Sequence, residues 1–175
     1  AEIISAAYRD SFFANNGVQL ATARAGNVIG GGDWSKDRLI PDILRSLEAN
    51  EIISIRSPSS IRPWQHVLEP VTGYILLAQK LGEKQDVFSE AWNFGPEEND
   101  CWSVGEIVTH VCEIAQKGSW DTPAIIQPHE ASLLKLDSSK AKASLGWVPR
   151  WKVSEALKKT IEWYQKFLSG DDMYE

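Results

Sequence analysis

The chain of 175 residues lacks the features that mark several special classes of protein. No run of 18 apolar residues occurs, so no segment is predicted to span a membrane. The two cysteines, Cys101 and Cys112, form no C-x-x-C pair and have no zinc-type spacing to a histidine. This excludes a metal site or a redox pair built on them. So few cysteines also favour a reducing, cytoplasmic setting.

Basic residues are scarce as well. The chain has 18 Lys and Arg against 24 Asp and Glu, which gives a net charge of −6. A nucleic-acid-binding surface needs a basic stripe, so that class is excluded. An anionic ligand is still allowed, because a few arginines can set the local sign of charge inside a cleft. The length and the 43% hydrophobic content are typical of one globular domain, or of one lobe of a larger protein.

Complete catalytic motifs are missing too. The chain has no P-loop, no G-x-G-x-x-G and no Ser-His-Asp set. A Tyr-x-x-x-Lys pair is also missing, since Phe12 stands four residues after Tyr8. We therefore predict a binding lobe without a complete reaction centre, and no catalytic residue is assigned in this chain.

The most informative segment that is present reads R-A-G-N-V-I-G-G-G-D-W, from Arg24 to Trp34. Its glycines can adopt positive φ and let a ligand approach the main chain closely. Arg24 and Asn27 add donors suited to phosphate or sugar oxygens. The apolar run 18–23 precedes it, and a strand that leads into such a loop is where open α/β sheets place ligands. The alternative is a plain tight turn.

Hydrophobic periodicity predicts strands alternating with helices, which indicates an α/β or mixed α+β fold with a small second lobe. The predicted helices are 1–13, 39–49, 69–81, 103–115, a short one ended by Gly146, and a last one that begins at Ser154. The predicted strands are 18–23, 52–56, 61–67, 91–94, 122–127 and 133–136. The first helix has no cap before it, so we expect the chain to be a fragment.

Caps and apolar faces are predicted for three of these helices. Ser103 and Glu106 form a capping box, S-x-x-E. Ser154 is expected to cap the last helix, whose apolar stripe is Leu157, Ile161, Tyr164 and Leu168. The helix 69–81 is expected to turn four residues inward: Val71, Tyr74, Ile75 and Ala78.

Outside the glycine-rich segment, three further residues are candidates for binding. Arg62, within I-R-P-W-Q-H-V, can reach out to clamp a diphosphate, or else form a surface ion pair. Asn93 ends a strand in W-N-F-G-P and alternatively only holds the turn. His129, in P-H-E, is otherwise a solvated residue. Of the other histidines, His66 is expected in the core or at an interface, and His110 is assigned no role.

Taken together, these segments resemble the extended short-chain dehydrogenase/reductase family, in its branch that acts on nucleotide sugars. The G-G-G-D-W and R-P-W-Q-H variants point to the members that act on CDP-glucose. The similarity covers nearly the whole chain and rests on these stretches: 24–34, 37–45, 61–70, 92–96, 129–131, 134–141 and 145–151.

The resemblance implies roles for individual residues. Asn27 matches an asparagine that contacts the diphosphate, Arg62 the arginine that clamps it, and Asn93 lies on the phosphate side. Leu39, Ile40 and Pro41 resemble a segment against the base and ribose, and His129 falls in a stretch that reaches the nucleotide. The main chain of Ala25 and Gly26 resembles the loop that meets the nicotinamide end of NAD.

The resemblance also implies a fold and an activity. The fold would be α/β, the C-terminal part of a Rossmann-type doubly wound sheet plus a small mixed α/β substrate-binding lobe. The N-terminal NAD-binding half would be absent from this chain. The intact protein would be a homodimeric, NAD-dependent lyase that dehydrates CDP-glucose, or a related sugar nucleotide, to a 4-keto-6-deoxy sugar. Another nucleotide-sugar 4,6-dehydratase, a 4-epimerase and a non-catalytic binding lobe are the alternatives, and no residue chemistry selects cytosine.

Overall fold

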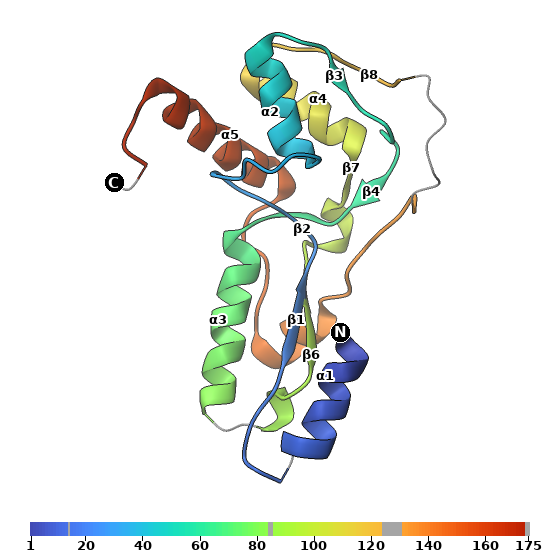
Figure 1. The fold of residues 1–175 in the computed structure, drawn as a ribbon, viewed down its shortest axis with the longest axis vertical. Helices are drawn as coiled ribbons and strands as arrows, with labels where there is room; N and C mark the ends of the chain where they lie inside the picture. The colour runs from blue at the N-terminus through green and yellow to red at the C-terminus, as the bar shows by residue number, and fades with distance from the viewer. Residues whose placement is uncertain (14, 84–85, 124–130, 174–175) are drawn as a thin grey trace.

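The structure, a computed structural model, describes residues 1–13, 15–83, 86–123 and 131–173. Helices and short strands alternate along the chain, as predicted (Figure 1). The α-helices are α1 (Glu2–Tyr8), α2 (Leu39–Ala49), α3 (Leu68–Gly82), α4 (Val104–Ala115) and α5 (Val153–Ser169), and the predicted short helix before Gly146 is a π-helix, η4 (Ala141–Leu145). The strands are β1 (Thr22–Ala25), β2 (Asn27–Ile29), β3 (Ile53–Ser54), β4 (Ile61–Arg62), β5 (Trp64–His66), β6 (Ala91–Phe94), β7 (Trp102–Ser103) and β8 (Trp120–Asp121).

Strands β1 and β2 follow one another through the middle of the molecule and join its lower part to its upper part (Figure 1). Strand β1 pairs in parallel with β6, and β2 pairs in parallel with β5. The change of partner takes place at Gly26. The remaining pairs are β3 with β8, which is parallel, and β4 with β7, which is antiparallel. The parallel pairs fit the predicted α/β class.

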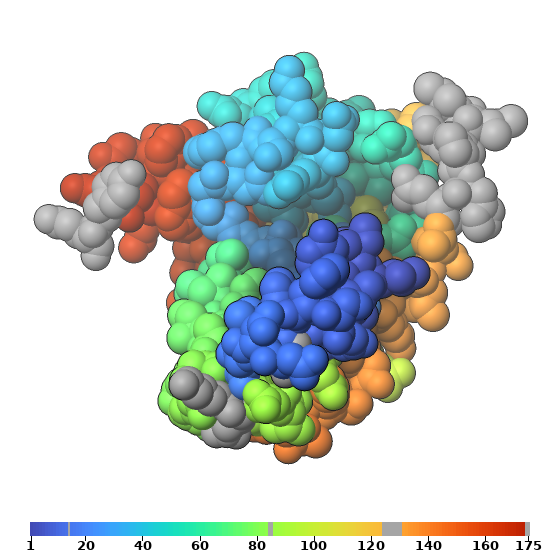
Figure 2. Space-filling model, turned by 60° about the horizontal axis from the view of Figure 1, so that its bottom comes forward, coloured from blue at the N-terminus to red at the C-terminus, as the bar shows by residue number. Residues whose placement is uncertain are grey.

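Two hydrophobic cores lie at the two ends of these successive strands. The α2–α5 core, in the upper part of Figure 1, contains Ile43, Ile107 and Leu157 among its fully buried side chains. The α3–β6 core, in the lower part, is built around Trp92 and Phe94. Helix α1 lies on the lower part and stands at the surface, in dark blue, in the space-filling view (Figure 2). No helix among the described residues is long and apolar enough to cross a bilayer.

The glycine-rich segment is not one loop, as the sequence suggested. Residues 24 and 25 belong to β1, residues 27–29 form β2, and the loop begins only at Gly30. The predicted strand 61–67 is also divided, into β4 and β5, at Pro63. Proline has no N–H to donate to a ladder, which explains the interruption.

Two predicted strands differ more strongly. In place of the predicted strand 122–127, the structure has β8 at Trp120–Asp121. Residues 122 and 123 are not in a strand, and 124–127 lie outside the described residues. The segment 133–136 makes only a single bridge, between Leu133 and Ile61. Its backbone is therefore pinned at one point and forms no strand.

The faces and caps of the helices are partly as predicted. The capping box of Ser103 and Glu106 is confirmed at the start of α4. The predicted inward face of α3 is confirmed only for Tyr74, whose ring packs against Phe94 in the core. Val71 and Ile75 are 37% and 64% exposed and Ala78 is exposed as well, so the helix buries a face that includes Gly73 and Leu77. A side chain at Gly73 would collide with the ring of Phe94, so the missing side chain is what lets α3 lie directly on β6.

Helix α5 also differs from the prediction at both ends. Ser154 does not cap it; the carboxylate of Asp100 accepts from the backbone N–H of Val153 at 2.7 Å instead. Leu157, Ile161 and Tyr164 are buried as expected, but Leu168 is 59% exposed. The last turn of α5 therefore extends beyond the core that its first turns fill.

Candidate functional site

A cleft of about 1080 Å³ opens between α2, β2 and the segment that runs from β3 to β4. It brings together residues from well-separated parts of the sequence. The predicted binding residues that line it are Gly26, Asn27, Leu39, Ile40, Pro41 and Arg62. A cleft of this size is at the upper end of the range for small-molecule sites.

The backbone explains why Asn27 and Arg62 lie at the same place. The N–H of Asn27 donates to the carbonyl of Pro63 at 2.9 Å. Pro63 directly follows Arg62 in the chain. Gly26 makes this contact possible, since a Cβ at position 26 would lie 2.2 Å from that same carbonyl oxygen. The glycine therefore serves the close approach of two chain segments at the point between β1 and β2 where the pairing partner changes.

The guanidinium of Arg62 is held in place by main-chain acceptors. Its Nη1 donates to the carbonyl of Ile61 at 2.9 Å and to the carbonyl of Ala131 at 2.8 Å. The residue is half-buried. Two such bonds fix the direction of the planar fork, and charge-assisted bonds from a fixed fork to phosphate oxygens are among the stronger ones in proteins.

The first turn of α2 forms an apolar part of the wall. Ile40 and Pro41 are buried and Leu39 is half-buried. Pro41 lies in the first helical turn, where its missing N–H leaves no intrahelical bond unmade. The flat face of a base, or the carbon-bearing face of a ribose, is the kind of ligand part that such a wall accommodates.

Other predicted residues lie outside this lining. Ala25 ends β1 beside Phe94 and does not line the cleft. Asn93 is paired across the strands with Arg24, and its Nδ2 donates to the carbonyl of Asp137 at 3.0 Å. Its Oδ1 is buried without a hydrogen-bond partner, so a donor could still be accommodated there. His129 lies outside the described residues.

Arg24 is engaged elsewhere. Its Nε lies 3.6 Å from Oε1 of Glu2, and Oε2 of the same Glu2 accepts from the hydroxyl of Thr22 at 2.7 Å. The predicted donor of the glycine-rich segment therefore joins α1 to β1 and does not line the cleft.

The Gly-Gly-Gly run packs against the protein itself. Of the four glycines in the segment, only Gly32 has a positive φ, 78°. A Cβ at Gly31 would lie 2.1 Å from the ring of Trp163 on α5, and one at Gly30 would lie 2.8 Å from Val67. Glycine is thus required here mainly because neighbouring side chains fill the space.

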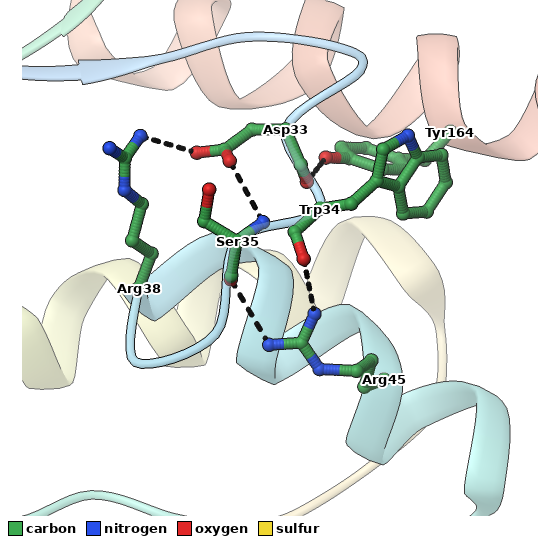
Figure 3. Close-up of polar contacts among 6 residues, drawn as sticks. All are labelled: Asp33, Trp34, Ser35, Arg38, Arg45 and Tyr164. Carbon is green, nitrogen blue, oxygen red and sulfur yellow. Dashed lines mark hydrogen bonds and ion pairs between the residues drawn. The ribbon is translucent and has the colours of Figure 1, made fainter.

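The loop that follows is fastened to two helices (Figure 3). The carboxylate of Asp33 accepts from the N–H of Ser35 and from Arg38, each at 3.0 Å. Arg45 on α2 donates to the carbonyls of Trp34 and Ser35, at 3.2 Å each. The hydroxyl of Tyr164 on α5 donates to the carbonyl of Asp33. These contacts hold the edge of the cleft at a fixed distance from its apolar wall.

The charge of Asp33 is stabilised by the same contacts. Partial burial acts to raise the pKa of its carboxyl, but the hydrogen bonds from Ser35 and Arg38 outweigh it and hold the pKa below its usual range. Asp33 is therefore ionised at neutral pH and neutralises Arg38.

Several residues of the cleft were not singled out from the sequence, among them Arg38, Arg45 and Arg56. The available signal for Arg56 was the alternation of buried Ile53 and Ile55 with exposed Ser54 and Arg56, typical of an extended segment with one solvated face. Arg56 lines the cleft together with Arg38, Arg45 and Arg62.

Comparison with known proteins gives the context of this cleft. The chain is 52% identical, over 99% of its length, to the CDP-glucose 4,6-dehydratase of Salmonella typhimurium, and spans 50% of that protein. It is 26% identical over 84% of its length to the dTDP-D-glucose 4,6-dehydratase of Mus musculus, of which it spans 41%. The predicted family resemblance is thereby confirmed. No protein-family model matches the chain.

Solved structures of similar proteins agree in fold. The dTDP-glucose 4,6-dehydratase of Streptomyces venezuelae, with NAD and TYD bound, matches 99% of this chain and 51% of its own, with a TM-score of 0.79 at 18% identity. The UDP-glucuronic acid 4-epimerase of Bacillus cereus, in complex with UDP-glucuronic acid and NAD, matches 95% of this chain and 50% of its own, with a TM-score of 0.78 at 18% identity. The predicted α/β, Rossmann-type fold class is confirmed. The chain spans about half the length of the curated relatives it matches.

Proposed function

We propose that this chain supplies the sugar-nucleotide-binding portion of an NAD-dependent CDP-glucose 4,6-dehydratase. The main support is the 52% identity to such an enzyme over almost the whole chain. The cleft that Asn27, Arg62 and the first turn of α2 share is the second support, because it offers cation, amide and apolar groups to one ligand.

The residues of the cleft would act by holding the substrate. Arg62 and Asn27 bind the diphosphate, and Leu39, Ile40 and Pro41 lie against the base and ribose. In the proposed reaction, C4 of the hexose is oxidised to a ketone, which makes the C5 hydrogen acidic. Water is then lost across C5 and C6, which leaves a C5=C6 double bond. The hydride removed from C4 is returned to C6 and a proton is added at C5, so the net change is the loss of one water. Fixing the diphosphate places the hexose carbons for these steps, and fixed orientation lowers a barrier by on the order of several kcal/mol.

The residues present fit NAD at one end only. Strands β1 and β6 are parallel and end side by side at Ala25 and Phe94, and carboxyl ends of parallel strands are where dinucleotides bind. Ala25 and Gly26 therefore fit the nicotinamide end. When bound, NAD supplies reversible hydride transfer. The sequence contains no dinucleotide-phosphate loop and no Tyr-x-x-x-Lys pair, so we place those parts in a separate NAD-binding half.

Assembly and location follow as inferences. Helix α1 exposes Ile3, Ile4 and Tyr8 by 86%, 64% and 52%, and Phe12, just after the helix, is 58% exposed. This apolar surface supports a homodimer in the intact protein. Cys101 and Cys112 are both free thiols, which supports a reducing, cytoplasmic setting.

A second reading is another nucleotide-sugar 4,6-dehydratase or a 4-epimerase, because the solved structures of similar fold include both reaction types. A non-catalytic binding lobe is the third. The test is to incubate the intact enzyme with NAD and with CDP-, dTDP-, UDP- and GDP-hexoses. The proposal expects a 4-keto-6-deoxy product from CDP-glucose; a product from another nucleotide alone, an epimerised sugar, or binding without turnover would contradict it.

A further inference from the structure

Four arginines line the cleft, and three of them have partners within the protein. Arg38 binds Asp33, and Arg45 binds Asp42 and two carbonyls of the 33–35 loop. Arg62 donates to the carbonyls of Ile61 and Ala131. Arg56 is exposed, and no hydrogen bond or ion pair joins its side chain to any residue in the described parts of the chain.

The cleft as a whole carries no excess of positive charge, since Asp33, Asp37, Asp42 and Glu51 line it as well. Two of these carboxylates are neutralised by Arg38 and Arg45. Asp37 precedes α2, and Glu51 follows it five residues before Arg56; no ion pair joins either carboxylate to Arg56 within the described residues. The cleft is therefore not a uniformly basic surface, and what it offers an anion at Arg56 is a guanidinium with no directly paired carboxylate in the described chain.

The backbone around Arg56 is fixed by neighbouring segments. The N–H of Ile55, just before it, donates to the carbonyl of Asp121 at 2.9 Å. The turn that follows, residues 57–60, is closed by a bond from Ser60 to Ser57 at 3.1 Å and is held to the start of α4 by bonds from residues 104 and 105. Arg62 stands two residues beyond this turn, so one anchored turn carries both arginines.

We propose that Arg56 is a second cation for the diphosphate of the sugar nucleotide, in the cleft that the amide of Asn27 also lines. This inference rests on the proposed function and adds to it. Each of the two phosphoryl groups carries an ionised oxygen, whereas Arg62 has part of its donor capacity engaged by main-chain carbonyls. Arg56 supplies the guanidinium that is not engaged within the described chain, and a guanidinium is well matched to phosphate oxygens.

The test is calorimetric titration of the full chain and of its Arg56→Ala variant with three probes: CDP, cytidine and inorganic pyrophosphate. We expect Arg56→Ala to lower the affinity for CDP and for pyrophosphate by the same factor, at least about tenfold, and to leave the affinity for cytidine unchanged. The loss should shrink at high salt, because the interaction is between exposed charges. Arg56→Lys, which keeps the charge but not the fork, should lose less than Arg56→Ala.

Arg150→Ala is the matched control, because it removes an exposed arginine that does not line the cleft. An equal loss in this control would mean that net charge alone is responsible and would overturn the proposal. A loss with CDP and cytidine but not with pyrophosphate would also overturn it, since Arg56 would then contact the base. If the unsubstituted chain binds no CDP at all, the proposed function itself fails; if it binds CDP and a folded Arg56→Ala binds it equally well, only the role of Arg56 fails.

Discussion

The three consecutive glycines at 30–32 each face a different constraint. Gly32 adopts a positive φ, Gly30 lies against Val67, and Gly31 lies against the ring of Trp163. Trp163 also stacks on Phe167, 5.5 Å away between ring centroids, and Trp34 packs against both rings. The glycine run therefore fixes the edge of the cleft by letting the loop lie flat on an aromatic cluster of α5.

Replacing Gly31 by alanine should destabilise the fold. The new Cβ would lie 2.1 Å from Cδ2 of Trp163, so the loop or the ring must shift, and overpacking of this kind costs about 1–3 kcal/mol. The free energy of unfolding is measured by urea denaturation. Gly82→Ala is the control, because no atom lies within 4 Å of a Cβ there and the site ends α3. Equal effects of the two substitutions would contradict this account.

In the proposed binding site, Arg62 is expected to clamp the diphosphate. Removing its guanidinium should weaken sugar-nucleotide affinity at least about tenfold, since a charge-assisted bond contributes about 1.5–3 kcal/mol and tenfold corresponds to about 1.4 kcal/mol. Titration of a folded Arg62→Ala variant with CDP-glucose measures this. Unchanged affinity would show that the diphosphate binds elsewhere.

At the scale of helices and strands, the start of α5 shows a limit of sequence reasoning. Ser154 has the right residue type for a cap, but the group that accepts from the N–H of Val153 is the carboxylate of Asp100, 53 residues away in the chain. A local pattern cannot predict a cap that arrives through tertiary packing. By contrast, the capping box at Ser103 is wholly local, and the sequence predicted it correctly.

Asp100→Ala should therefore destabilise the protein by about 1 kcal/mol, the usual effect of losing an N-terminal cap. Ser154→Ala should change the free energy of unfolding by less than about 0.5 kcal/mol, because no side-chain cap bond is made at that end of α5. Thermal or urea unfolding of both variants gives the comparison. A larger loss in Ser154→Ala than in Asp100→Ala would reverse this assignment.

In the rest of the fold, too, elements with a local signal were predicted correctly and features set by tertiary packing were not. The positions of α2, α3, α4 and β6 were predicted to within a few residues, because long periodic segments and local caps carry their own signal. Which face of α3 is buried could not be predicted in the same way, because its apolar residues are spread over more than one face. The packing of Gly73 on Phe94 decides which face is buried. The lining of the cleft shows the same difference. Asn27 and Arg62, which line it, stand in recognisable motifs, whereas Arg56 belongs to a short alternation of buried and exposed residues that matches no motif.

In the whole molecule, the two cores are tied together by polar groups as well as by the successive strands β1 and β2. The side chain of Gln65 in β5 donates to the carbonyl of Phe94 in β6 at 2.7 Å. The buried carboxylate of Glu69, at the start of α3, accepts from the N–H groups of Arg150 and Trp151 at 3.0 and 2.9 Å. These last residues lead directly into α5, so Glu69 joins the helix of one core to the approach of a helix of the other.

His66 lies beside this junction and makes the stability of the whole fold depend on pH. Its ring packs edge-on against Trp151, with centroids 4.9 Å apart, and only 8% of the residue is exposed. Burial lowers the pKa of His66, and the negative charge of Glu69 opposes this shift without overcoming it. The unfolded chain therefore binds a proton at His66 more readily than the folded chain does. The neutral, buried ring contributes to stability above the pKa of the unfolded state, about 6.5, and this contribution is lost as the pH falls through the lower pKa of the folded state.

We expect the free energy of unfolding to decrease between pH 7 and pH 5, with a slope from this histidine of at most about 1.4 kcal/mol per pH unit. His66→Asn removes the titrating ring and keeps an acceptor for the N–H of Leu68, which lies 3.3 Å from Nδ1. The variant should be less stable at pH 7, because the contact with Trp151 is lost, but its slope over this range should be smaller. Urea denaturation at several pH values measures both quantities. Parallel slopes for the two proteins would show that the proton is taken up elsewhere than at the junction of the two cores.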